Sequence, residues 1–245
     1  MSLTNAQLEQ YRNEGYAAGG RILDDIELAR LRGELDSIIE SLPPDRRPEN
    51  MPSLHYENGY LRDLFLSDGL IDVAAQIVGP DVALFTSYVI SKRPDDGLAV
   101  DWHQDAAFFP IEPMDTFTLW LAVDDSDVEN GCMRVLPGTH RKRAVLLHKV
   151  DLDSGTTLPM SLENLDLSNA RDVQLRAGEY SVHDPWVLHG SNPNRSSRRR
   201  CGITLKYIST HAAIDRTFVS PSGFDWDGLR LYLARGNPGR HSYVN

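Results

Sequence analysis

The hydrophobic period of the chain changes at Pro80, and this change restricts the fold more than any other feature of the sequence. Before Pro80 the apolar residues recur every three to four positions, as on one face of a helix. Two capping boxes are predicted there, Thr4 with Gln7 and Asp24 with Glu27. After Pro80 the chain runs in short stretches rich in β-branched and aromatic residues, which are typical of strands. The sequence therefore joins an N-terminal helical part to a β-rich part.

The helical part covers residues 1–79. Two N-terminal helices are predicted, and in the second of them leucine and isoleucine recur at helical spacing from 28 to 42, until two prolines end the run. Residues 43–59 are rich in residues that break regular structure, so they predict a long loop. A short helix is predicted in DGLIDVAAQIVGP, where a glycine and a proline stop it.

Seven stretches after Pro80 predict strands: 82–93, 115–125, 132–138, 143–148, 172–178, 179–184 and 201–210. Asn130-Gly131 and Ala177-Gly178 predict turns. Many short strands behind helices predict a mainly β fold with flanking helices, a sandwich or jelly roll whose helices pack outside. The 245 residues contain no internal repeat or linker, so we expect a single domain over 1–245 with its β core at about 83–210.

The net charge of the chain indicates which kinds of partner the protein is expected to bind. Twenty-five Lys and Arg against 35 Asp and Glu give a net charge of −10, which opposes binding to nucleic acid and to anionic lipid. The basic run RSSRRR is too short to reverse this expectation. No apolar stretch approaches the ~20 residues of a membrane span, and two cysteines are too few for a disulfide framework. We therefore expect a soluble cytoplasmic protein that binds a small molecule.

The stretch DWHQDAAFFP places a histidine and an aspartate two residues apart. If the chain is extended there, period 2 puts His103 and Asp105 on one face, where both can reach the same point. A third ligand is expected from SVHDPWVLHGSNPNR, in which His183 and His189 are both candidates. Two histidines and one carboxylate form the facial triad that leaves three coordination positions open on Fe(II). The pair alone also fits a capped turn or a surface hydrogen bond.

The surroundings of this pair resemble one family. WHQDAAFFP, LWLAVDDSDVENGCMRVLPGTHR and LHGSNPNRSSRRR are similar, in this order, to signatures of the phytanoyl-CoA dioxygenase family of iron- and 2-oxoglutarate-dependent oxygenases. The resemblance extends from about Leu84 to Tyr207, and LEQYRNEGY resembles the opening helix of that family. It implies a double-stranded β-helix, a cupin-like jelly roll, and an enzyme that uses Fe(II), 2-oxoglutarate and O2.

Position by position, the resemblance assigns three residues to iron: His103, Asp105 and His189. It assigns the distal carboxylate of 2-oxoglutarate to Arg200, eleven residues after the last histidine, helped by the hydroxyl of Ser191. A guanidinium with two parallel donors is the natural partner of a buried carboxylate. Tyr88 and Trp120 match positions that line the cosubstrate pocket of the family.

Three neighbouring arginines compete with Arg200 for this role. Arg195 falls in the turn predicted for SNPNRS, where it is solvated. Arg199 takes the opposite face of the strand by period 2, whereas Arg198 shares the parity of Arg200 and is the real competitor.

Period 2 also predicts which strand residues face a common cavity. One face is expected to hold Thr86, Tyr88 and Lys92 on one strand with Thr118 and Trp120 on another, and the opposite face Phe85, Phe117, Leu119 and Leu121. For Trp120 the alternative is core packing. His183 is expected to donate a hydrogen bond within the sheet or near the metal, His140 to be structural, and Cys132 and Cys201 to be buried apolar groups.

The activity implied by the resemblance is hydroxylation of an unactivated C–H bond, coupled to conversion of 2-oxoglutarate to succinate and CO2. Asp105 favours hydroxylation, because related halogenases have a small residue at this position. A CoA thioester would need a basic mouth, for which the candidates are few: Arg46, Arg47 and Lys92. We therefore expect a small metabolite as substrate. Four segments are expected to border the mouth: 43–59, 106–109, 149–171 and the tail after His211.

Two hypotheses from other classes remain. A cupin-like isomerase or hydrolase would use the metal as a Lewis acid and would need no dicarboxylate pocket. A non-catalytic jelly roll would only bind a ligand. Arg200 with Ser191 argues against the first hypothesis, and the intact triad argues against the second.

Overall fold

Two antiparallel sheets form the body of the protein. The computed structural model describes residues 2–150, 156–158, 160–162, 164–220 and 222–244. The larger sheet has the order β1-β11-β6-β13-β3-β15, with β2 paired to β3. Its strands are β1 (Tyr16–Arg21), β2 (Met51–Pro52), β3 (Val82–Lys92), β6 (Thr116–Ala122), β11 (Glu179–His183), β13 (Arg200–Ser209) and β15 (Tyr232–Arg235).

The smaller sheet has the order β10-β7-β12-β4 and carries His103 and His189, whereas His183 lies on β11 of the larger sheet. The strands of the smaller sheet are β4 (Val100–His103), β7 (Met133–Leu136), β10 (Arg171–Val173) and β12 (Leu188–Ser191). Two further pairs are short: β5 (Ile111–Glu112) with β14 (Ala213–Ile214), and β8 (Lys149–Val150) with β9 (Met160–Ser161). This is the mainly β double-stranded β-helix, or jelly roll, with flanking helices that the sequence predicts.

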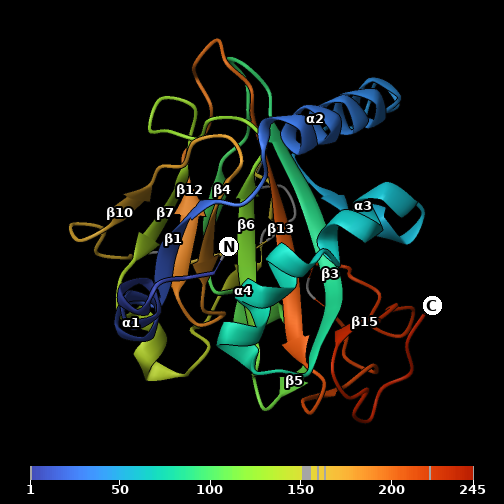
Figure 1. Cartoon of the computed structure of the whole chain (residues 1–245). Coiled ribbons are helices and arrows are strands. Elements are labelled where there is room, and N and C mark those ends of the chain that lie inside the picture. The colour runs from blue at the N-terminus through green and yellow to red at the C-terminus, as the bar shows by residue number, and fades with distance from the viewer. Residues whose placement is uncertain (1, 151–155, 159, 163, 221, 245) are drawn as a thin grey trace.

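The helices cover the outer face of the larger sheet (Figure 1). They are α1 (Asn5–Glu14), α2 (Asp25–Glu40), α3 (Gly59–Phe65) and α4 (Asp68–Val78). Three short 3₁₀ helices lie elsewhere in the chain, η1 (Leu54–Tyr56), η2 (Asp105–Phe108) and η3 (Thr139–Lys142), and η2 lines the inner side. Both predicted capping boxes are present, at the starts of α1 and α2. The apolar face of α4 packs against β3, β6 and β13, and this burial leaves the inner face of the sheet free to line a site.

One predicted strand is absent, and several observed strands were not predicted, among them β1, β12 and β15. Residues 143–148 form no strand, because Leu147 is 97% exposed and Val145 is 47% exposed, so their apolar side chains have no sheet to cover. The strand β1 was not predicted, because YAAGGR lacks the residues that signal strands. Its Gly19 lies against the ring of Tyr180, where a Cβ would come within 2.2 Å of a ring carbon. Both predicted Asn-Gly and Ala-Gly turns are present, with positive φ at Gly131 and Gly178.

The face predicted for Phe85 was also wrong. Thr86 pairs with Lys206 and Leu84 with Tyr207, so a bulge leaves Phe85 as an extra residue between two pairs. Phe85 therefore packs with Phe109, at 5.4 Å between ring centroids, and with Trp226. The other three residues of the predicted outer face do lie in the core under the helices: Phe117, Leu119 and Leu121. Among the described residues, no helix is long and apolar enough to cross a membrane.

Candidate active site

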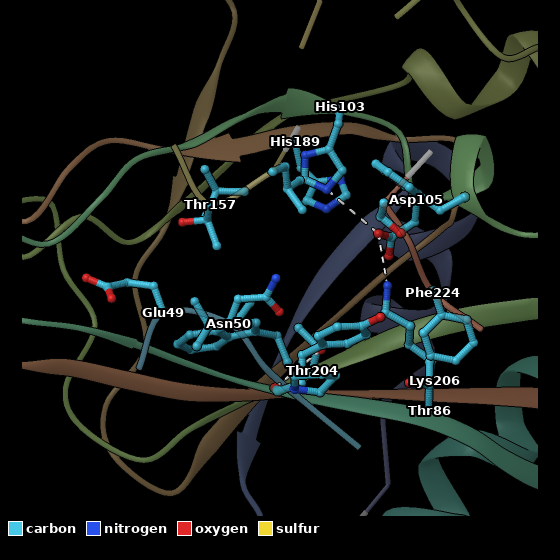
Figure 2. A pocket seen from close by; sticks show the side chains of 18 of the residues that line it. Glu49, Asn50, Thr86, His103, Asp105, Thr157, His189, Thr204, Lys206 and Phe224 are labelled. Atoms are coloured by element: carbon cyan, nitrogen blue, oxygen red, sulfur yellow. Dashed lines mark hydrogen bonds and ion pairs between the residues drawn. The ribbon is translucent and has the colours of Figure 1, made fainter. Parts of the chain in front are cut away.

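A cavity of about 250 Å³ opens between the two sheets. Its walls come from the inner faces of both sheets and from the loops at their ends (Figure 2). All four segments predicted to border it contribute residues: Glu49, Asn50 and Pro52; Phe108 and Phe109; Thr157 and Leu158; and Ser222, Gly223, Phe224 and Trp226. Residues 151–155, 159 and 163 of the third segment lie outside the described residues.

Three of the predicted ligands meet at one side of this cavity. His103 ends β4 and His189 lies on β12, where the two are direct cross-strand partners with ring centroids 4.1 Å apart. Asp105 begins η2. One ligand atom from each of the three residues lies within 4.8 Å of the others, and all three side chains are buried. The structure thus brings together the His-Asp-His set expected from the sequence.

The local conformation that achieves this differs from the prediction. The strand β4 ends at His103, the backbone remains extended at Gln104, and η2 begins at Asp105, so the two ligands lie on different elements. Gln104 stabilises the turn, since its side-chain amide donates to Trp186 O at 2.9 Å and accepts from Leu146 N at 2.8 Å. As a result, Asp105 Oδ1 lies 3.7 Å from His103 Nε2.

Both histidines are held in the tautomer that suits a metal. His103 Nδ1 lies 2.7 Å from the carbonyl oxygen of Asp101, and His189 Nδ1 lies 3.0 Å from that of Val187. Since a carbonyl can only accept, each Nδ1 must carry the proton, and each Nε2 has a free lone pair. Burial, together with the neighbouring His103 and His183, holds the pKa of His189 well below its usual value, which keeps this ring neutral.

The carboxylate of Asp105 is ionised and tightly held. Thr118 Oγ1 donates to its Oδ2 at 2.6 Å, and Lys206 Nζ lies 3.0 Å from its Oδ1. Burial by itself raises the pKa of Asp105, but the nearby Lys206, His103 and His183 outweigh burial and hold it well below the usual value. Asp105 therefore offers a permanent negative charge to a cation.

His183, the other candidate for the third ligand, lies behind the set. Its Nε2 is 3.5 Å from Asp105 Oδ2, and its ring centroid is 4.4 Å from that of His189. Neither ring nitrogen has a partner at normal hydrogen-bond distance among the described residues. Burial lowers its pKa, although Asp105 opposes this effect, so the ring is neutral beside the carboxylate. The position of His183 favours a role in which it supports the carboxylate of Asp105 over a role in which it coordinates the metal directly.

The far end of the cavity holds Arg200, the first residue of β13. Its Nη2 donates to Gly131 O at 2.9 Å and lies 3.4 Å from Ser191 Oγ, and its guanidinium is 5.5 Å from the centre of the Trp120 ring. Its buried Nε has no hydrogen-bond partner among the described residues. Burial lowers the pKa of Arg200 to about 10, so this side chain remains charged.

Lys92, the cross-strand partner of Arg200, lies beside it. It was predicted as a candidate for a basic mouth, but it is fully buried, and its Nζ donates to Ser191 Oγ at 2.7 Å and to the carbonyl of Asn192. Burial, and then the charge of Arg200, lower the pKa of Lys92 to about 6. The far end of the cavity thus has a buried cation and a second basic group whose oxygen partners are uncharged.

The arginines that compete with Arg200 are engaged elsewhere. Arg198 pairs with Asp127 at 2.7 Å and with Glu129 at 3.3 Å, on the surface. Arg199 pairs with Asp36 and with Asp124, and Arg195 donates to the carbonyl of Asp95. Of these four arginines, Arg200 is the one that lines the cavity.

The remaining predicted residues are placed as follows. Tyr88 and Trp120 line the cavity, so Trp120 is a wall of the site and not only part of the core. The contact of His140 Nε2 with the carbonyl oxygen of Arg12, at 3.1 Å, fits the structural role that was predicted. Both cysteines are buried, as predicted. Arg47, a candidate for the mouth, pairs with Glu49 at 2.7 Å and with Asp96 at 2.9 Å.

The sequence analysis missed one charged residue of the site, Lys206. It lies on β13 and its ammonium lines the cavity beside Asp105. A signal was available, because Lys206 shares the parity of Arg200 and Thr204 on a strand that was predicted, and period 2 places all three on the inner face.

The comparisons with known proteins agree with this geometry. A family model described as phytanoyl-CoA dioxygenase (PhyH) matches residues 4–202. The chain is 31% identical over 172 residues to a probable alpha-ketoglutarate-dependent hypophosphite dioxygenase of Stutzerimonas stutzeri, an alignment that covers 68% of this chain and 58% of that protein. It is 24% identical over 215 residues to the peroxisomal phytanoyl-CoA dioxygenase of Bos taurus, covering 85% of this chain and 64% of that protein. The matched parts thus span about three fifths of these two relatives.

Among solved structures, the apo form of the non-heme monooxygenase ThoJ superposes with a TM-score of 0.78 at 22% sequence identity, over 97% of this chain and 86% of that chain. This likeness concerns the fold, whereas the match to the family model covers most of the sequence. The chain belongs to the phytanoyl-CoA dioxygenase family of Fe(II)- and 2-oxoglutarate-dependent oxygenases.

Proposed function

We propose that this protein hydroxylates an unactivated C–H bond of a small-molecule metabolite. Fe(II) is held by His103, Asp105 and His189, and the distal carboxylate of 2-oxoglutarate is bound by Arg200 with Ser191. The observation that supports this most strongly is the buried guanidinium of Arg200, which faces the cavity. Among the described residues its Nε has no hydrogen-bond partner, and its Nη2 contacts a carbonyl and a hydroxyl.

The donor set fits iron. Two imidazole nitrogens with free lone pairs and one ionised carboxylate form the facial triad typical of non-heme Fe(II) oxygenases, which leaves three positions for cosubstrate and O2. The Nδ1 hydrogen bonds of His103 and His189 orient both rings before a metal arrives. When bound, Fe(II) supplies the oxidising chemistry, in which 2-oxoglutarate becomes succinate and CO2 and one oxygen atom enters the substrate.

The far end of the cavity fits a carboxylate. Leaving a charged side chain buried without an opposite charge is costly, and the partners of Arg200 are a carbonyl and a hydroxyl. A carboxylate supplies the missing charge and the acceptor that Nε lacks. Tyr88 and Trp120 form walls between the two ends, so a dicarboxylate that reaches from the triad to Arg200 is enclosed by aromatic rings.

Asp105 supports hydroxylation over halogenation, because its carboxylate fills the ligand position that a halide would need. A small metabolite is favoured over a CoA thioester. Two of the three basic residues that were candidates for a phosphate-binding mouth are committed: Lys92 is buried at the far end, and Arg47 is paired with two carboxylates. The cavity volume of about 250 Å³ also suits a small ligand.

The test is to add Fe(II) and 2-oxoglutarate to the metal-free protein without oxygen. We expect the weak visible charge-transfer band of an iron–keto-acid chelate and a higher melting temperature. Admission of O2 with candidate metabolites should then give succinate, together with a product that has gained one oxygen by mass. If 2-oxoglutarate causes neither a band nor a change in melting temperature, the oxygenase proposal is wrong and a Lewis-acid enzyme of the cupin type is favoured.

A further inference from the structure

Lys206 is a buried cation inside the cavity. Its side chain reaches from β13 across to the triad, with Nζ 3.0 Å from Asp105 Oδ1 and 4.5 Å from the centre of the Phe109 ring. Figure 2 shows it pointing at Asp105 from the wall opposite the two histidines, with Phe224 beside it. The side chain of Lys206 is 9% exposed, so its ammonium depends on partners within the cavity.

The oxygen that Lys206 contacts is the one that faces the metal ligands. Asp105 Oδ1 is 3.0 Å from Lys206 Nζ and 3.7 Å from His103 Nε2, whereas Thr118 and His183 lie on the side of Oδ2. A metal cation held by this triad therefore competes with Lys206 for the same oxygen. The ion pair is weakened when the site is loaded, and the ammonium then needs another acceptor.

The charge balance of the site with Fe(II) and 2-oxoglutarate bound also indicates that Lys206 needs another acceptor. This step rests on the function proposed above. The two positive charges of Fe(II) and the one of Arg200 are balanced by Asp105 and the two carboxylates of 2-oxoglutarate. The two ligating histidines add no charge, because each can coordinate a metal as a neutral imidazole whose Nδ1 donates to a backbone carbonyl, and Glu49 on the cavity wall is paired with Arg47. At the triad end, the positive charge of Lys206 then remains without a counterpart.

We propose that Lys206 binds an anionic group of the substrate, so that the substrate is a small organic monoanion such as a carboxylate. Its charge lies on Lys206 next to the metal, and its apolar part packs against the aromatic wall: Phe108, Phe109, Phe224 and Trp226. The anion of such a substrate lies close to the reacting carbon. A CoA thioester, whose phosphates are remote from its acyl chain, does not meet this requirement.

Binding without turnover tests the proposal. Protein loaded with Ni(II) in place of iron, and with 2-oxoglutarate, is titrated by calorimetry with two matched pairs: hexanoate against hexanamide, and phenylacetate against phenylacetamide. Hydrogen bonds between charged groups are worth roughly a factor of 10 to 100 in affinity, so we expect the acids to bind at least about tenfold more tightly than the amides. In Lys206→Met this ratio should fall to about one, with Ni(II) and 2-oxoglutarate still bound.

Two further variants separate charge from packing. Lys206→Arg keeps the charge and should retain a preference for the acids. Thr204→Val alters an uncharged residue on the same face of β13 and should keep the full ratio. The proposal is overturned if the wild-type protein binds neither acid or binds the amides as tightly, or if Lys206→Met retains the preference.

The alternative role for Lys206 is support of Asp105 alone. In that case Lys206→Met and Lys206→Gln would both lose Ni(II), a result that also overturns the proposal. Failure of the oxygenase function itself looks different, because the wild-type protein would then fail to bind Ni(II) with 2-oxoglutarate before any acid is added.

Discussion

Each end of the cavity has a buried lysine, Lys206 in its wall and Lys92 behind Ser191 and Arg200, but the lysines have different surroundings. Lys206, at the triad, lies 3.0 Å from a carboxylate supplied by the protein itself. Lys92, at the far end, contacts a hydroxyl and a carbonyl and lies beside Arg200. The triad end thus contains its own negative charge for a metal, whereas the far end has an excess of basic groups. This contrast indicates which charge each end receives from its ligand, a cation at one and an anion at the other.

The largest expected effect concerns the triad. We expect His103→Ala and His189→Ala to lose most bound iron and all turnover, because each removes one of three ligand atoms that lie within 4.8 Å of one another. Iron content after dialysis and succinate formation measure the two effects. His183→Ala is the matched control, since it removes a buried histidine beside Asp105 that is outside the ligand set. Iron loss in His183→Ala together with iron retention in His189→Ala would show that His183, and not His189, is the third ligand.

At the far end, we expect Arg200→Ala to raise the 2-oxoglutarate requirement at least about a hundredfold. Removing one partner of a buried charge pair costs roughly 3–5 kcal/mol, which corresponds to two to three or more orders of magnitude in binding. Iron binding should be retained, because the triad lies at the other end.

Arg198→Ala is the matched control for this variant. Its guanidinium makes surface ion pairs with Asp127 and Glu129, so the requirement should change by less than about twofold. Titration of 2-oxoglutarate against both variants measures this requirement. A large loss of 2-oxoglutarate affinity in Arg198→Ala alone would show that Arg198, and not Arg200, binds the distal carboxylate.

A smaller effect is expected at Lys92, whose protonation state should change when 2-oxoglutarate binds. Its pKa is lowered from 10.5 to about 6, mainly by burial, so this amine is mostly neutral at pH 8 in the unliganded protein. A carboxylate bound nearby favours the charged form and raises this pKa, so binding of 2-oxoglutarate at pH 8 should take up a proton. Calorimetry in buffers of different ionisation enthalpy measures this uptake. It should disappear in Lys92→Met, and its absence in the wild-type protein would contradict the electrostatic difference between the two ends.

The smallest effect concerns the wall beside Arg200. A Cβ at Gly202 would come within 2.1 Å of the Trp120 ring, so Gly202→Ala must displace the indole that contacts Arg200. We expect a loss of about 1–3 kcal/mol in the free energy of unfolding, with a weaker affinity for 2-oxoglutarate. Gly33→Ala, on the exposed side of α2 with no atom near its Cβ, should raise stability by up to about 1 kcal/mol. Urea unfolding of both variants decides whether the indole position matters.

Much of the site follows from strand parity. Thr86, Tyr88 and Trp120 face the cavity as period 2 predicts, and Arg200 is inward while Arg199 is outward. The family resemblance, and not the pattern, selected His189 over His183, since both are buried and their rings are close neighbours. The assignments to iron and to 2-oxoglutarate stay predictions until the variants above are measured.

The errors arise where a strand departs from regular geometry. The bulge in β3 turns Phe85 to the inner side, and the end of β4 at His103 places Asp105 on a helical turn. Neither event has a local sequence signal, because each depends on distant partners, such as the hydrogen bonds of Gln104 to residues 146 and 186. Lys92 was misplaced for a different reason. A lysine is rarely fully buried, so its burial was not expected even though its parity was predicted correctly.

The short strand β1 covers what would otherwise be an exposed edge of the larger sheet. It pairs with β11, where Tyr16 lies opposite His183 and Ala17 opposite Val182, so it covers one side of a strand that runs past the triad. Without the segment up to Arg21, β11 would present a row of unpaired N–H and C=O groups to solvent, which is a template for intermolecular strand pairing. In β1 itself the exposed end is Gly20 and Arg21, a small and a charged residue that discourage a further strand from adding. We therefore expect removal of this segment to cause aggregation through the sheet edge, even where the metal ligands remain intact.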